Sequence, residues 1–179
     1  MNIKPISRRA FLLGGAALVP YLYFQTKFIA VTRYTIPVNN LPANFHGFTI
    51  LHLTDLHSKE YGDSQEKLLN LIKKQQFDMV AITGDMVVKN NPSLEPSLQL
   101  IRGLKNIPVY FVPGNHDQIL KKQMLESFTS LGVQVLENKA EKIVRGDSHF
   151  WLLGVDDPYL GLDRLDLALQ GVDETSPRR

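Results

Sequence analysis

The chain has 179 residues, of which 44% are hydrophobic and 21% are charged, which is enough for one globular domain with a sizeable core. It contains no cysteine, which excludes a disulfide scaffold and a thiolate metal site. The formal net charge is +2, but residues 1–33 carry +5 and the rest, with 15 basic and 18 acidic residues, carries −3. The body of the protein therefore lacks a basic excess, and we expect no nucleic-acid partner.

The first 33 residues resemble a targeting segment. The run Ser7-Arg8-Arg9-Ala10-Phe11-Leu12 precedes an apolar stretch, as in twin-arginine export signals. Residues 10–26 carry no charge, and their length lies at the lower edge of a membrane span. Both an uncleaved membrane anchor and removal of the segment stay open. We therefore expect an exported protein, either membrane-anchored or extracytoplasmic, whose functional domain occupies residues 34–179.

Apolar runs and residues at helical spacing alternate along the rest of the chain. The apolar runs predict strands at 49–54, 78–83, 108–112, 133–136, 142–144 and 150–155. Helical spacing predicts helices near 68–72, 94–101, 124–131 and 162–169, the first after a capping box of Asp63 and Glu66 and the third closed by Gly132. This alternation predicts an α/β fold with a parallel sheet, and the last two strands are expected to form a hairpin around Gly146.

Polar clusters follow three of the predicted strands. They are Asp55-Leu56-His57, Gly84-Asp85 and Gly114-Asn115-His116-Asp117, and 30 residues separate Asp55 from Asp85 and Asp85 from Asn115. Each interval fits one strand–helix–strand passage, so all three clusters should project from the carboxyl edge of one sheet, where ligands bind. Taken singly, these residues suit ordinary roles such as helix N-caps or turns. Their occurrence at three consecutive strand ends favours a shared site.

The residue types in these clusters suit metal chemistry. Asp55 and His57, in the spacing D-x-H, can turn toward one cation, Asp85 can bridge two cations, and Asn115 offers a neutral carbonyl oxygen. Two divalent ions ~3.5–4 Å apart clamp a phosphoryl group and acidify a water held between them. The sequence therefore predicts a metal site for phosphoryl chemistry.

Together, D-x-H, G-D and G-N-H-D over residues 46–157 resemble the calcineurin-like metallophosphoesterases, and the N-terminal segment resembles their exported, membrane-associated bacterial branch. The resemblance implies metal-dependent hydrolysis, in which a hydroxide held by manganese, iron, zinc or similar divalent ions attacks phosphorus. It implies a phosphoester substrate, lipid-linked or nucleotide-linked. It also implies a role for each cluster residue: Asp55 and His57 hold the first metal, Asp85 bridges both metals, Asn115 binds the second, His116 stabilises or protonates the leaving oxygen, and Asp117 orients His116 by accepting its other N–H.

The chain departs from the family pattern after residue 157. The Gly-His and Gly-His-x-His motifs that supply three further metal ligands are absent, and the last histidine is His149. We therefore expect one ion, or none, to be fully held instead of two. The expected fold is part of the family's α-β-β-α sandwich, with the first sheet present and the second incomplete, and with an exposed sheet face that invites association. Two alternatives stay open: an inert truncated remnant that binds at most one metal, and a half-domain completed by a partner chain.

Overall fold

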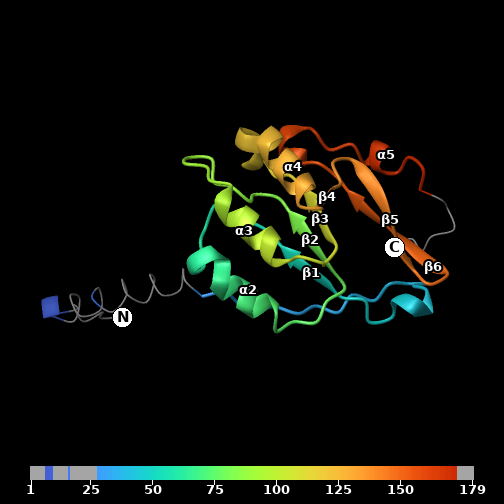
Figure 1. The fold of residues 1–179 in the computed structure, drawn as a ribbon, viewed down its shortest axis with the longest axis horizontal. Helices are drawn as coiled ribbons and strands as arrows, with labels where there is room; N and C mark the ends of the chain where they lie inside the picture. The colour runs from blue at the N-terminus through green and yellow to red at the C-terminus, as the bar shows by residue number, and fades with distance from the viewer. Residues whose placement is uncertain (1–6, 10–15, 17–27, 173–179) are drawn as a thin grey trace, which may run out of the picture. The chain divides into compact units, whose positions relative to one another are not determined.

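The computed structural model describes residues 7–9, 16 and 28–172 (Figure 1). Most of the predicted export segment lies outside these residues, so that prediction is untested. No helix in the described part of the chain combines the length and the apolar character that a membrane crossing requires. Residues 1–35 and residues 36–179 are separate units, and the second unit contains the sheets and the candidate site.

A four-stranded parallel sheet forms the centre of the second unit. Its strands, in spatial order, are β1 (Ile50–Leu53), β2 (Met79–Thr83), β3 (Val109–Val112) and β4 (Gln134–Val135). The register places Leu51 beside Val80, and Ile82 beside Phe111. Val80, Ile82 and Phe111 are buried, as expected for the continuous apolar runs of parallel strands. The sheet confirms the predicted α/β class, and its parallel strands bring the carboxyl ends to one edge.

Three helices follow the first three strands of this sheet. They are α2 (Glu66–Ile72), α3 (Glu95–Gly103) and α4 (Lys121–Ser130), and α3 contacts both α2 and α4. Phe128 of α4 packs edge-on against Phe111 of β3, with 4.9 Å between the ring centroids. Gly132 follows α4 with a φ of +87°, which confirms its predicted place at the helix end. These helices cover one face of the sheet (Figure 1), and the contact with Phe128 places the Phe111 side chain on that face.

The second sheet is a hairpin on the opposite face of the parallel sheet. Its strands are β5 (Lys139–Arg145) and β6 (Ser148–Gly154), which pair antiparallel around Gly146. Ile143 and Leu152 of the hairpin pack against a buried cluster of Met79, Tyr110 and Leu136. The described residues thus form a helix layer, a four-stranded sheet and a two-stranded sheet, which confirms the expected partial sandwich. Ile50 on β1 is exposed, and association through this region stays a prediction.

The predicted capping box at the start of α2 was wrong. Asp63 lies in a short 3-10 turn, η2 (Asp63–Gln65), and α2 begins after Gln65 without a side-chain cap. The buried Gln65 side chain anchors this start instead, because it donates to Lys59 O (2.7 Å) and accepts from Tyr61 N (3.0 Å).

The last predicted helix shortens to α5 (Leu165–Ala168), preceded by the 3-10 turn η4 (Pro158–Leu160). The Asn138 side chain contacts Leu162 O and Arg164 N, at 2.9 Å each, and so holds the preceding residues outside the helix. Two further 3-10 turns are η1 (Ala43–Phe45) and η3 (Asp117–Leu120).

An ion-pair network links α4 to the ends of β4 and β6. Lys121 contacts Glu137, and its Nζ lies 3.4 Å from Asp156 Oδ2. Asp156 is only 3% exposed, and its backbone N–H donates to Asn138 Oδ1 at 3.1 Å. Partial burial lowers the pKa of Lys121, but the hydrogen bonds and charges of Glu137 and Asp156 outweigh it and raise this pKa above 10.5. The network fastens the hairpin to the parallel sheet.

Candidate metal centre

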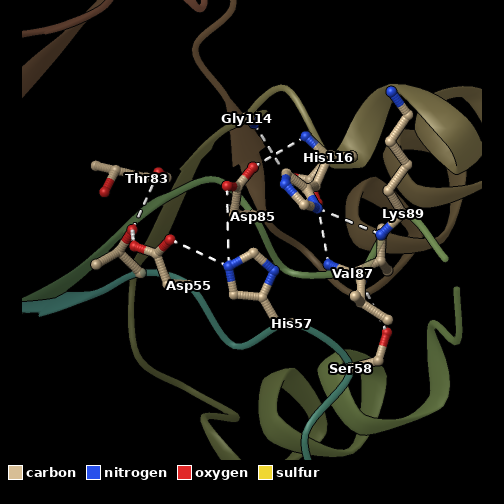
Figure 2. Close-up of polar contacts among 12 residues, drawn as sticks. Asp55, His57, Ser58, Thr83, Asp85, Val87, Lys89, Gly114 and His116 are labelled. Atoms are coloured by element: carbon tan, nitrogen blue, oxygen red, sulfur yellow. Dashed lines mark hydrogen bonds and ion pairs between the residues drawn. The ribbon is translucent and has the colours of Figure 1, made fainter.

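The loops after β1 and β2 are joined by backbone hydrogen bonds that continue beyond the strands. Asp55 N donates to Gly84 O at 3.2 Å, and His57 N donates to Asp85 O at 2.9 Å. Ser58 N donates to Met86 O at 2.9 Å. These hydrogen bonds hold the loop after β1 against the loop after β2, and the Asp55, His57 and Asp85 side chains lie close together (Figure 2).

Two glycines let the loops after β2 and β3 approach each other closely. A Cβ on Gly84, whose φ is +83°, would overlap the backbone of Gly114. A Cβ on Gly114 would overlap Oδ1 and the amide nitrogen of Asp85. Any side chain at either position must push the loops apart. Asp85 Oδ1 then accepts the His116 amide N–H at 3.0 Å, which ties the third cluster to the second.

Carboxylate oxygens and imidazole nitrogens converge at this edge (Figure 2). His57 Nε2 lies 3.3 Å from Asp55 Oδ1 and 4.0 Å from Asp85 Oδ2. His57, Asp85 and His116 each offer a ligand atom, and these atoms all lie within 4.8 Å of one another. The side chains are open to solvent, with exposed fractions of 58% for Asp55, 36% for His57 and 19% for Asp85. Oxygen and imidazole ligands in such proximity suit a divalent transition ion.

The backbone of the site is strained in a way that points to function. Asp55, His57, Ser58 and Asp85 have φ values of 57°, 49°, 55° and 53°, in the left-handed region that favours glycine. Each non-glycine residue in this region costs on the order of 1 kcal/mol or more. Such strain clusters at active sites, where the side chain is needed despite its cost. Here it coincides with the predicted ligands.

Asp117 makes two contacts that the sequence did not predict, and its predicted role of orienting His116 stays a prediction. Its buried carboxylate accepts Val87 N–H at Oδ1 (3.1 Å) and Gly114 N–H at Oδ2 (3.0 Å). Burial raises the pKa of this carboxyl, although the amide hydrogen bonds from Gly114 and Val87 oppose the rise. Asp117 therefore braces the loops after β2 and β3, because both of its oxygens are engaged by backbone amides. Asn115 lies half-buried in the same loop, and its role as a ligand of a second metal stays a prediction.

A backbone amide also contacts the His116 ring. Lys89 N–H donates to His116 Nδ1 at 3.3 Å (Figure 2). When Nδ1 of a neutral imidazole accepts a hydrogen bond, the ring proton resides on Nε2. A protonated Nε2 can donate to an oxygen and cannot ligate a metal. This arrangement suits the His116 ring to proton donation from Nε2. That Asp55, His57 and Asp85 hold a metal stays a prediction.

Sequence reasoning missed the residues that support the site. Ser58 and the amides of Val87, Val88 and Lys89 carry no motif, and a serine beside a histidine has no distinguishing pattern. His52 Nε2 contacts Thr83 Oγ1 on the neighbouring strand at 2.7 Å. These contacts depend on tertiary structure.

Residues 48–165 match the calcineurin-like phosphoesterase family, and the chain belongs to that family. It is 33% identical over 156 residues to the uncharacterized metallophosphoesterase YkoQ of Bacillus subtilis, covering 81% of this chain and 57% of YkoQ. It is 27% identical over 163 residues to a transmembrane protein with metallophosphoesterase domain of Danio rerio, covering 82% and 37% respectively. It is also 28% identical over 111 residues to the DNA double-strand break repair protein Mre11 of Methanosarcina mazei, covering 53% and 18%. The chain thus spans about half the length of YkoQ and less of the other two.

Proposed function

We propose that the protein is a metal-dependent phosphoester hydrolase whose first metal is held by Asp55, His57 and Asp85. The observation that carries this proposal is the convergence of two carboxylates and an imidazole from two loops, all on left-handed backbone, at the carboxyl edge of the sheet. Family membership supports phosphoester chemistry. The donor set supports manganese, iron, zinc or a similar divalent ion.

Each residue of the centre has its own role in the proposed hydrolysis. A divalent ion, when bound, supplies positive charge for a phosphoryl group and acidifies a water. His116 donates from Nε2 to the phosphoryl or leaving oxygen. Asp85 holds the His116 backbone through Oδ1, at 3.0 Å from the His116 amide, and keeps Oδ2 for the metal. The high exposure of Asp55 leaves the site open to a large phosphoester.

The test combines metal analysis with hydrolysis of bis(p-nitrophenyl) phosphate by the full chain. We expect bound divalent metal and metal-dependent hydrolysis, both lost in Asp85→Asn. Asp147→Asn is the matched control, because Asp147 is exposed in the turn of the hairpin. Equal metal content in the wild type and Asp85→Asn would refute the site. Bound metal without hydrolysis would instead support a protein that binds metal and is catalytically inert.

We further propose that the protein is exported by the twin-arginine route and acts at a membrane on a lipid-linked or nucleotide-linked phosphoester. The Arg8-Arg9 pair and the +5 charge of residues 1–33 support export. The test replaces Arg8 and Arg9 by lysine and compares cell fractions, with Arg33→Lys as the control. Export is expected to fail only in the first variant. Hydrolysis of CDP-diacylglycerol, compared with bis(p-nitrophenyl) phosphate, tests the substrate class.

The acidic balance of residues 34–179 supports a small phosphoester over nucleic acid as the substrate. One of the relatives, Mre11 of Methanosarcina mazei, is a DNA double-strand break repair protein. A single-stranded oligonucleotide therefore belongs in the substrate panel, and faster hydrolysis of it than of any small diester would overturn this preference.

A further inference from the structure

The segment of residues 86–93 runs past the metal centre without helix or strand. The backbone amides of Val87, Val88, Lys89 and Ser93 nevertheless donate hydrogen bonds to side chains. Val87 N–H donates to Asp117, and Lys89 N–H donates to His116. The position of this segment, hereafter the 86–93 segment, therefore decides what His116 contacts.

The hydroxyl of Ser58 fastens the 86–93 segment at two points. Ser58 Oγ accepts Val88 N–H at 3.2 Å and Ser93 N–H at 3.1 Å. It also donates to Ser93 O at 3.0 Å. A hydroxyl has one proton to donate and two lone pairs, so these three hydrogen bonds use its whole capacity. The full use of one small side chain, on left-handed backbone at a φ of 55°, indicates a specific role.

Lys89 lies between the two fastened points, next to Val88 in the chain. Its amide is therefore held at a fixed position, from which it donates to His116 Nδ1. Without the Ser58 hydroxyl, Val88 N–H and Ser93 N–H lose their acceptor. Met86 and Val87 stay held by Ser58 N–H and by Asp117, so the part that is freed to move away from His116 is residues 88–93, which includes Lys89. Nδ1 would then lose its donor, and the ring would be free to carry its proton on either nitrogen.

We propose that Ser58 is a positioning residue for His116. Its hydroxyl holds the 86–93 segment, the segment holds the Lys89 amide against Nδ1, and the proton of the neutral ring is thereby kept on Nε2. In this role Ser58 acts indirectly, because its hydroxyl contacts the backbone of Val88 and Ser93 and not the proposed metal ligands. The consequence for catalysis rests on the proposed function, whereas the consequence for the tautomer does not.

The test is the tautomer of His116 in the metal-free full chain, measured by long-range ¹H–¹⁵N spectra of the histidine rings at pH 8. The His116 signals are assigned from their loss in His116→Gln. We expect the Nε2–H tautomer in the wild type and a mixture of both tautomers in Ser58→Ala. Ser93→Ala is the matched control, because Ser93 joins the contact through its backbone, and it should keep the wild-type tautomer.

A second variant separates the lost hydroxyl from the backbone strain. Ser58→Gly removes the hydroxyl but relieves the left-handed conformation, so it should fold at least as well as Ser58→Ala and show the same mixed tautomers. An unchanged His116 tautomer in both variants would overturn the proposal, as would an equal change in Ser93→Ala.

Kinetics then test the consequence for catalysis. We expect Ser58→Ala to lower kcat about tenfold with little change in KM, which is part of the ~10²–10⁴-fold that a positioned proton donor contributes. In the His116→Gln background, Ser58→Ala should have no further effect on kcat, and an additive loss there would overturn the role through His116. If the wild type does not hydrolyse phosphoesters, the proposed function fails, while the tautomer result still decides the role of Ser58.

Discussion

Replacing Lys121 by methionine removes the cation that serves two carboxylates while keeping most of the side-chain volume. Lys121 Nζ lies 3.4 Å from Asp156 Oδ2 and also contacts Glu137. Asp156 is 3% exposed, so its charge is left without a counter-ion and with little access to water. We therefore expect Lys121→Met to destabilise the fold at neutral pH.

The size of this loss follows from the geometry. Removing one partner of a buried ion pair costs ~3–5 kcal/mol. The cost here should lie at or below the low end, because the Lys121 side chain is 24% exposed and Asp156 Oδ1 keeps a 2.8 Å hydrogen bond from Asp157 N–H. A loss of about 2–3 kcal/mol, at ~2–4 °C per kcal/mol for a domain of this size, lowers Tm by about 5–10 °C.

Thermal unfolding followed by circular dichroism measures this loss, with Lys122→Met as the matched control. Lys122 is exposed in the first turn of the same helix and should change Tm little. Equal Tm values for the two variants at pH 7 would refute the reasoning.

The remaining predictions concern the centre and its pH dependence. Gly114→Ala should abolish metal binding measured by elemental analysis, since its Cβ would overlap Asp85. Gly132→Ala also strains the backbone, because the φ of Gly132 is +87°, but its Cβ meets no other atom and it follows α4 away from the centre, so it should keep the metal. Mn²⁺ at about 100 times its Kd should raise stability by ~2.7 kcal/mol, and an equal rise in Asp85→Asn would show that the metal binds elsewhere. The raised pKa of Lys121 stabilises the fold below pH 10.5, and this contribution is lost as pH rises through the folded-state pKa. Urea unfolding between pH 9 and 11.5 should therefore show a steeper alkaline decline in the wild type than in Lys121→Met.

The strands and the shared edge could be predicted because their causes are local. Continuous apolar runs predicted β2 and β3, and the mostly apolar run of residues 49–54 predicted β1. The regular spacing of Asp55, Asp85 and Asn115 then predicted that their loops lie together. A parallel sheet then requires the strand ends to meet at one edge. The metal-ligand candidates follow from residue type and this topology alone.

The supporting contacts could not be predicted, because they depend on atoms distant in sequence. The Asp117 oxygens accept amides of Gly114 and Val87, which only the folded loops bring into reach. The Ser58 hydroxyl likewise meets Ser93, 35 residues away. Gln65 replaces the predicted capping box for the same reason, since one of its acceptors, Pro96 O, lies on α3.

The left-handed backbone at Asp55, His57 and Asp85 lowers the stability of the fold, whereas their side chains are the proposed metal ligands. This conflict bears on protein engineering. Glycine at Asp55, His57 or Asp85 would relieve a conformation that costs on the order of 1 kcal/mol per position. A library sorted only for thermal resistance would therefore accumulate glycine at the positions that we propose as metal ligands. Robust but metal-free variants would dominate such a screen, and a metal-dependent readout must accompany every round of selection.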